Sequence, residues 1–337
     1  MKKNVTLAKT SFHIATPHLF PIALAACLVA SGIASAQQTY PTKPVRLIVP
    51  SSPGGGTDTT ARIVANKLGE FLGQQIVVEN RPGAASMIGS EYVVRSAPDG
   101  YTLLIVPSTL VIVPSIYRKM LFDPIKDLAP VTKLISIPQM LVSHPSLPTI
   151  TLKDLMALAR AKPGQLDYAA GGYGGHGHMS MVLFLNMTGL NLNYIPYKSG
   201  NAGLVDTLAG QVPIMMGNVL ALLPHVRSGK LRAYGTSSVK RAAALADIPT
   251  IAEAGVPGYD SRQWFGICVP AATPRDIVNR LHRDLGRVLS EGDIKKRFAL
   301  DAGETAWSAS PEEFGMSLRA DLAKWAKVVK DAKLKQR

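Results

Sequence analysis

Cysteine is scarce in this sequence, with two residues in 337, and that scarcity excludes a scaffold held together by disulfides. Charged residues make up 18% of the chain and aromatic residues 6%, whereas 47% is hydrophobic, which excludes a disordered polymer. No apolar run reaches the roughly 20 residues that a membrane-spanning helix needs. The length favours two folded domains.

Signatures of nucleic-acid binding are also missing. The net charge is +14, but the basic residues are scattered along the chain. No zinc-finger spacing, RNP-like aromatic motif or basic helix with heptads occurs. We therefore expect no nucleic-acid partner, and the charge indicates a solvated surface with a mild attraction for anions.

The first 36 residues have the composition of a secretory signal peptide. Lys2, Lys3 and Lys9 precede an apolar run at 19–30, and Ala34-Ser35-Ala36 supplies a small-residue cleavage site. An alternative processing event starts at Leu24-Ala25-Ala26-Cys27, which resembles a bacterial lipobox in which Cys27 becomes the lipidated first residue. Both routes predict export to the periplasm.

The other cysteine, Cys268, lies in an apolar run at 265–269. After cleavage at Ala36 it has no cysteine partner. We expect it to be a small core residue rather than a reactive thiol.

Strand and helix patterns alternate along the rest of the chain. Residues 44–49 read as a buried strand, a glycine turn follows, and an amphipathic helix runs through Leu72. Further strands are predicted at 75–78, 101–106 and 139–143, and helix starts at Thr151, Thr250, Thr273 and Ser310. This alternation predicts an α/β fold with mostly parallel sheets covered by helices.

Ligands of such folds bind at the carboxyl ends of strands, where glycine turns meet helix N-termini. Three turns fit that description, at residues 51–58, 170–178 and 197–202, and a weaker one lies at 216–218. The first turn exposes backbone N–H groups to an anion. It lacks the dinucleotide fingerprint, because Thr59 stands where glycine is needed, and no P-loop lysine follows. A purely structural tight turn is the alternative.

The second turn contains His176 and His178 among four or five glycines. Two histidines at this spacing raise the hypothesis of a metal site and a secreted metal-dependent hydrolase, but no nearby Glu or Cys cluster completes the ligand set. A packed or hydrogen-bonded His178 is the favoured interpretation.

The chain contains no strand-to-helix elbow of the kind that carries the nucleophile of a serine hydrolase. Lys198 stands where its ammonium can meet an anion, and nothing indicates a Schiff-base cofactor.

In combination, these motifs resemble the Bug family, the solute-binding components of tripartite tricarboxylate transporters. The resemblance rests on motifs that occur in the family's order over essentially the whole mature chain. They are YPTKPVR at 40–46, PGGGTD at 53–58, VENRPGA at 78–84, PDGYTLL at 98–104, PYK at 196–198, GKLRA at 229–233, IPTIAEAGVPG at 248–258 and PEEF at 311–314.

The resemblance implies a monomeric, two-lobed periplasmic binding protein of the type II, Venus-flytrap kind. It closes on a small carboxylate, which is a mono-, di- or tricarboxylate or an acidic amino acid, without catalysis or cofactor. Residues 37–137 and 263–337 are then lobe 1, and 138–262 are lobe 2. Its implied partners are transporter subunits in the membrane or, alternatively, a membrane sensor.

It also implies that backbone amides of the three turns hold the ligand's carboxylates. Carried onto this sequence, the ligand-binding residues are Gly54, Gly55, Gly56, Thr57 and Asp58, then Gly172, Tyr173, Gly174 and Gly175, then Tyr197 and Lys198, with Ser108 and Asn218 as neighbours. Gly175 stands where the family usually has a hydroxyl residue, which indicates a roomier, less hydroxylated pocket in which Tyr173 stacks on an aromatic acid.

Overall fold

The computed structural model describes residues 8, 9, 11, 40–300 and 302–336. The chain separates into two units, Met1–Tyr40 and Pro41–Arg337, and the second unit contains all the helices and strands described below. The predicted leader cleavage site and Cys27 lie outside the described residues. Within the described part, no helix combines the length and the apolar character that crossing a membrane requires.

One half of the sheet is built around three parallel strands. β1 (Val45–Val49) lies between β2 (Ile76–Asn80) and β3 (Thr102–Pro107), and β9 (Arg262–Pro270) adds antiparallel to β3. The helical segments of this half are α2 (Gly56–Leu72), η1 (Ala84–Ser86), α3 (Met87–Val94), η2 (Ser108–Val111), α4 (Val113–Ile116), α9 (Arg275–Ser290), α10 (Gly292–Leu300) and α11 (Pro311–Asp331). A short strand, β10 (Glu304–Thr305), pairs with β4.

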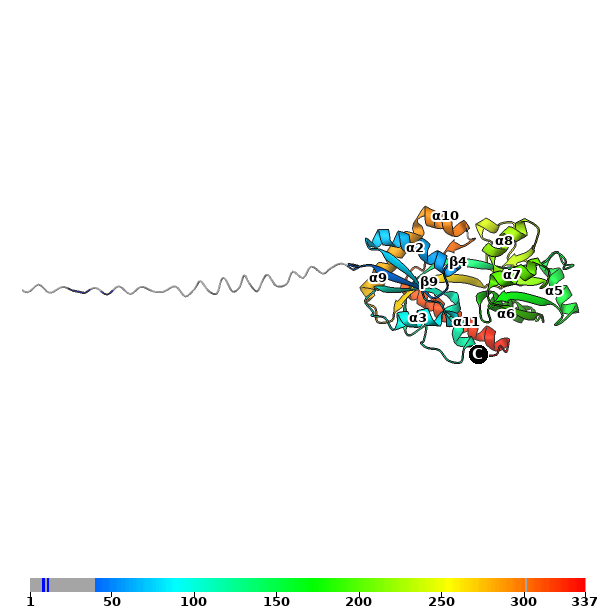
Figure 1. Ribbon diagram of the computed structural model, residues 1–337, viewed down its shortest axis with the longest axis horizontal. Coiled ribbons are helices and arrows are strands. Elements are labelled where there is room, and N and C mark those ends of the chain that lie inside the picture. Colours follow the sequence, from blue (N-terminus) through cyan, green and yellow to red (C-terminus); the bar gives the residue numbers. More distant parts are fainter. Residues whose placement is uncertain (1–7, 10, 12–39, 301, 337) are drawn as a thin grey trace, which may run out of the picture. The chain divides into compact units, whose positions relative to one another are not determined.

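The other half repeats the arrangement. β5 (Asp167–Gly171) lies parallel between β6 (Asn193–Tyr197) and β7 (Ile214–Asn218). The remaining elements are β8 (Arg232–Thr236), α5 (Leu152–Ala161), α6 (His176–Thr188), α7 (Gly200–Leu208), α8 (Val219–Arg227) and η3 (Ala243–Leu245). Figure 1 shows α5 to α8 gathered around these strands and α2, α3 and α9 around the first set.

A 16-residue strand, β4 (Leu128–Ser143), belongs to both halves. Residues 128–138 pair with β9, and residues 139–143 pair with β7 and β8. β4 and β9 therefore carry the chain between the halves (Figure 1). The crossings predicted near Ile137 and Gln263 coincide with this exchange of partners, and the lobe boundaries themselves stay a prediction.

The cores follow the same division, with one exception. The second half has its own cluster around Leu141, Tyr168 and Phe184. The first half's cluster, however, includes Met179 and Val182 from α6 of the second half. α6 thus packs into both cores and is a second connection between the halves. Cys268 is buried in the first cluster, as expected, and burial raises the pKa of its thiol.

Three local predictions need correction. The strand predicted at 139–143 is only the last part of β4, because Pro130, Lys133 and Pro138 hide the pattern of the preceding residues. Thr250 and Glu253 do make reciprocal cap bonds of 2.8 and 3.1 Å, but only a turn follows them. Thr273 donates its hydroxyl to the carbonyl of Pro270 and does not cap α9.

Candidate functional site

The first glycine loop connects β1 to α2. Gly54 has a φ of +80°, and its N–H donates to Asp58 Oδ2 at 2.9 Å. Gly55 is the N-cap of α2 and provides no side-chain acceptor. The first N–H groups of a helix have no acceptor inside it, so those of Gly56, Thr57 and Asp58 are available to a ligand.

Asp58 holds this loop from within. Its carboxylate accepts hydrogen bonds from Gly54, Arg62 and Asn80, and its side chain is 5% exposed. Burial alone would raise its pKa, but these hydrogen bonds outweigh burial and keep the pKa below its ordinary value. Both carboxylate oxygens are engaged by the protein, so the side chain of Asp58 shapes the loop, while its N–H lies in the first turn of α2, where the helix offers no acceptor.

The second glycine loop, between β5 and α6, repeats this geometry. Gly174 has a φ of +79°, and its N–H donates to His178 Nδ1 at 3.2 Å. Gly175 is the N-cap without a side-chain acceptor, and its own N–H donates to the carbonyl of Gly172 at 2.7 Å. The backbone N–H groups of Gly174 and Gly175, two of the predicted ligand-binding residues, are thus used within the loop, and the helix amides without an internal acceptor begin at His176.

His178 is packed among aromatic rings. Its ring centroid lies 4.1 Å from that of Tyr194 and 5.1 Å from that of Tyr173. Because Nδ1 accepts from Gly174, the neutral ring carries its proton on Nε2. This is the packed, hydrogen-bonded role that the sequence favoured over metal binding.

His176 connects the second loop to the first half. Its Nε2 donates to the carbonyl of Ser261 at 3.3 Å, and Nδ1 lies 3.3 Å from Ser108 Oγ at the end of β3. The ring also meets the edge of Trp325. Burial lowers the pKa of His176 to about 4, so the ring is neutral at pH 7. The carboxyl ends of β3 and β5 consequently face each other across this histidine.

Neither histidine belongs to a cluster with metal-ligand composition. No group of three or more His, Cys, Asp or Glu side chains that can hold a metal occurs in the described part of the chain. Both rings make the protein contacts given above. The geometry thus gives the metal-dependent hydrolase hypothesis no support.

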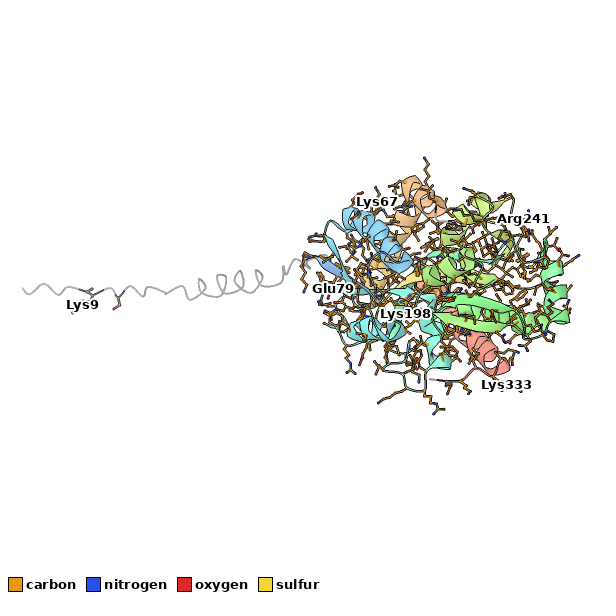
Figure 2. The ribbon with its side chains drawn as sticks, turned by 45° about the vertical axis from the view of Figure 1, so that its right-hand side comes forward. Lys9, Lys67, Glu79, Lys198, Arg241 and Lys333 are labelled. Atoms are coloured by element: carbon orange, nitrogen blue, oxygen red, sulfur yellow. The ribbon has the colours of Figure 1, made fainter. Side chains whose placement is uncertain are left out.

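The third turn follows β6. The phenol of Tyr197 donates to Asp206 Oδ2 at 2.7 Å, and desolvation together with this carboxylate raises the pKa of Tyr197 to about 12. Lys198 is exposed at the end of β6 (Figure 2). Ser199 caps α7 by accepting from Ala202 N–H at 3.2 Å. The Tyr197 ring therefore supports α7, whereas the Lys198 side chain is open to solvent.

Asn218 ends β7 opposite Gln139 of β4. Its Oδ1 accepts from the N–H of Leu220 at 2.9 Å, so the side chain caps α8. Its place beside the strand exchange puts it at the same sheet edge as the second glycine loop, since β7 and β5 are parallel neighbours.

A chamber of about 350 Å³ joins the two halves at the second glycine loop. One wall is formed by Gly172, Tyr173, Gly174 and Gly175, and the other by Ala85, Ser86, Thr109, Val113, Ile116 and Tyr117. The residues of this second wall were not predicted from the sequence. The first glycine loop, Tyr197, Lys198 and Asn218 do not line the chamber.

Part of that wall has an unusual backbone. Ala84, Ala85 and Ser86 have φ values of +45°, +53° and +77°, three consecutive left-handed residues directly before α3. Left-handed conformation costs a non-glycine residue roughly 1–2 kcal/mol. No sequence signal reveals such a turn, because alanine gives no preference for it.

Residues 60–334 match the model of the tripartite tricarboxylate transporter family receptor. The chain belongs to this receptor family. Protein BugT of Bordetella pertussis is 37% identical over 318 residues, covering 91% of this receptor and 96% of BugT. A protein of Bordetella bronchiseptica, also a relative by sequence, is 31% identical, covering 93% and 92% of the two chains. The family predicted from the sequence is confirmed.

Solved structures agree with this assignment. Rpa4515 of R. palustris, determined with adipate, is 34% identical, with a TM-score of 0.79 and coverage of 88% of this receptor and 100% of that chain. The periplasmic binding protein BugD has a TM-score of 0.76 at 29% identity, with coverage of 88% and 100%. MatC of Rhodopseudomonas palustris, determined with bound malate, has a TM-score of 0.74 at 27% identity, covering 86% and 100%. The predicted two-lobed α/β fold is confirmed.

Proposed function

We propose that this receptor captures a small carboxylate between its lobes in the periplasm and delivers it to a tripartite tricarboxylate-type transporter, without chemical conversion. The observation that carries the proposal is the pair of glycine loops, which present uncapped helix N-termini of the same geometry. The positive ends of helices favour anions, and the glycines let a carboxylate approach the backbone. The adipate and malate of the two solved relatives support a carboxylate ligand.

The proposed ligand contacts come from backbone amides and from side-chain groups. Amides of the segments 55–58 and 176–178 hold the carboxylate, and Gly54 and Gly174 keep the two loops in shape. Lys198 and the Ser108 hydroxyl contribute from the third turn and the end of β3. Lobe closure over residues 138–262 brings these groups to the ligand, and the two crossings at β4 and β9 permit that closure.

The energies are sufficient for such recognition. A hydrogen bond to a charged group nets about 1.5–3 kcal/mol, so four of them give about 6–12 kcal/mol. Micromolar binding needs about 8 kcal/mol after the costs of ordering are met. The hydrogen bonds supply the free energy that micromolar binding needs only when the cleft excludes water. Neutral amides also allow release, since no buried ion pair has to be broken.

The test is ligand-induced stabilisation of the purified protein. We expect at least one of adipate, malate, citrate, hexanoate and phenylacetate to raise its Tm. Gly54→Val should abolish that rise, because valine cannot adopt the φ of +80° without strain and the loop then loses its bond to Asp58.

A matched control separates loop shape from general strain. Gly73 has a φ of +67° at the end of α2, and, as at Gly54, no atom lies within 4 Å of an added Cβ. Gly73→Val should lower the Tm as much as Gly54→Val and keep the ligand response. A flat response of the unmutated protein to every carboxylate would reject the proposed function.

A further inference from the structure

The chamber beside the second glycine loop contains no charged side chain in its lining. Arg118 and Lys119 follow the wall residue Tyr117, but both are exposed and neither lines the chamber. The absence of a lysine or arginine matters for a receptor of carboxylates. A carboxylate placed inside this chamber would lose water without gaining a cation.

Most of the wall is apolar. Val113 and Ile116 are buried members of the first core, and Tyr117 and Tyr173 pack against that core with their rings half-buried. These four side chains offer two aliphatic surfaces and two aromatic rings to an occupant. Such a lining favours a hydrocarbon body and stacks well on a flat ring.

The polar groups of the wall are few and neutral. Ser86 and Thr109 line the chamber, and neither side chain makes a hydrogen bond among the described residues. At the base lies the second glycine loop, Gly172 to Gly175, and α6 begins directly after it. The chamber therefore offers one place for an anionic group, at its glycine-loop end, and hydroxyls suited to a neutral polar atom.

Several contacts fix the chamber's shape. Ile116 lies 3.3 Å from where a Cβ on Gly174 would stand, so the two walls meet there. The phenol of Tyr173 donates to the carbonyl of Lys335 at 2.8 Å, which ties that ring to the C-terminal segment. The N–H of Met87 donates to the carbonyl of Ala84 and closes the left-handed turn. A fixed cavity discriminates between ligands better than one that can adapt.

We infer that this chamber receives the uncharged body of the ligand, so the receptor's substrate class is monocarboxylates with an apolar or aromatic body rather than dicarboxylates or tricarboxylates. The inference rests on the proposed function and narrows it. The chamber's volume of about 350 Å³ leaves room for a small ligand with a hydrocarbon body. Phenylacetate and hexanoate are ligands of this kind.

Isothermal titration with a matched pair of ligands tests the inference directly. Hexanoate and adipate have six carbons each and differ by one terminal carboxylate. We expect hexanoate and phenylacetate to bind the purified protein about tenfold or more tightly than adipate, since the second carboxylate of adipate would lie against the uncharged wall. Adipate binding as tightly as hexanoate, or more tightly, would overturn the inference and leave the proposed function intact.

A variant at the half-exposed Tyr117 supplies the reciprocal test. Tyr117→Arg places a cation at the chamber wall and should shift the ratio of hexanoate to adipate affinity toward adipate by about tenfold. Tyr117→Met, uncharged and of similar length, should leave adipate the weaker ligand. An equal shift in both variants would contradict the electrostatic argument. If hexanoate, phenylacetate and adipate all fail to bind both the unmutated protein and Tyr117→Met, the inference and a carboxylate function of this chamber are rejected together. If malate or citrate binds and these three ligands do not, only the inference is rejected.

Discussion

The two glycine loops share a backbone and differ in what holds it. In each, a glycine with φ near +80° donates its N–H to a side chain four residues later, and a second glycine caps the helix. The acceptor is a carboxylate in Asp58 and an imidazole in His178. The same loop backbone is thus reached with a charged group in one lobe and a neutral ring in the other.

The two loops also differ in the parts of the molecule to which their side chains are bonded. Asp58 is tied by hydrogen bonds to Arg62 and Asn80, both close by in the same half of the molecule. The second loop is tied by ring packing to Tyr194 and, through His176, to Ser108 and Ser261. The first loop is therefore stabilised locally, whereas the second is linked to the segment that enters the crossing strand β9.

Removing the carboxylate of the first loop should have the largest effect. Asp58→Ala leaves Gly54, Arg62 and Asn80 without their acceptor, and we expect a loss of about 3–5 kcal/mol in the free energy of unfolding. Ligand affinity should fall about 100-fold as the loop relaxes. Urea unfolding and titration calorimetry measure the two quantities. Asp58→Asn keeps one acceptor oxygen and should lose less of both, and an Asp58→Ala protein with unchanged affinity would show that the loop shape does not depend on this carboxylate.

The second loop should respond to pH through His176. The native pKa of about 4 lies below the unfolded value of 6.5, so the unfolded chain binds more protons between these values. Stability should therefore fall as pH drops from about 6.5 to 4, at about 1.4 kcal/mol per pH unit and about 3 kcal/mol in all. The control is His176→Gln, whose amide can keep the bonds to Ser108 and Ser261 without a charge change. Urea unfolding of both proteins across this range should show the extra loss only with histidine, and parallel curves would refute the assignment.

The sequence predicted the repeated strand, glycine turn and helix because that information is local. β1 and β3 lie within one residue of their predicted bounds, α2 ends at the predicted Leu72, and α11 begins directly after its predicted cap Ser310, since apolar spacing and caps are read directly from neighbouring residues. β4 was found only in part, because its first eleven residues pair with β9, about 130 positions away, and tolerate two prolines. At residues 250–255 the predicted cap forms, but the residues after it make a turn and not the expected helix.

The site was less accessible to sequence reasoning for a similar reason. Both glycine loops were recognised, but the chamber wall at Ala85 and Ser86 depends on a left-handed backbone that tertiary packing imposes. The internal bond from Gly174 to His178 has a local signal that was overlooked. His178 stands four residues after Gly174, as Asp58 stands four residues after Gly54.

The smallest expected effect concerns Asn80, which connects the Asp58 side chain to the backbone of the first loop. Asn80 donates to both Asp58 Oδ1 and the carbonyl of Ser51, at 2.9 and 3.1 Å. Asn80→Ala removes these bonds but leaves Asp58 paired with Gly54 and Arg62, so we expect a loss of about 1 kcal/mol in stability and only a few-fold loss of affinity. A loss as large as that of Asp58→Ala would mean that Asn80, and not the bond to Gly54, fixes the loop. The likeness to the second loop, which forms the same geometry with no such asparagine, would then be a coincidence of backbone shape.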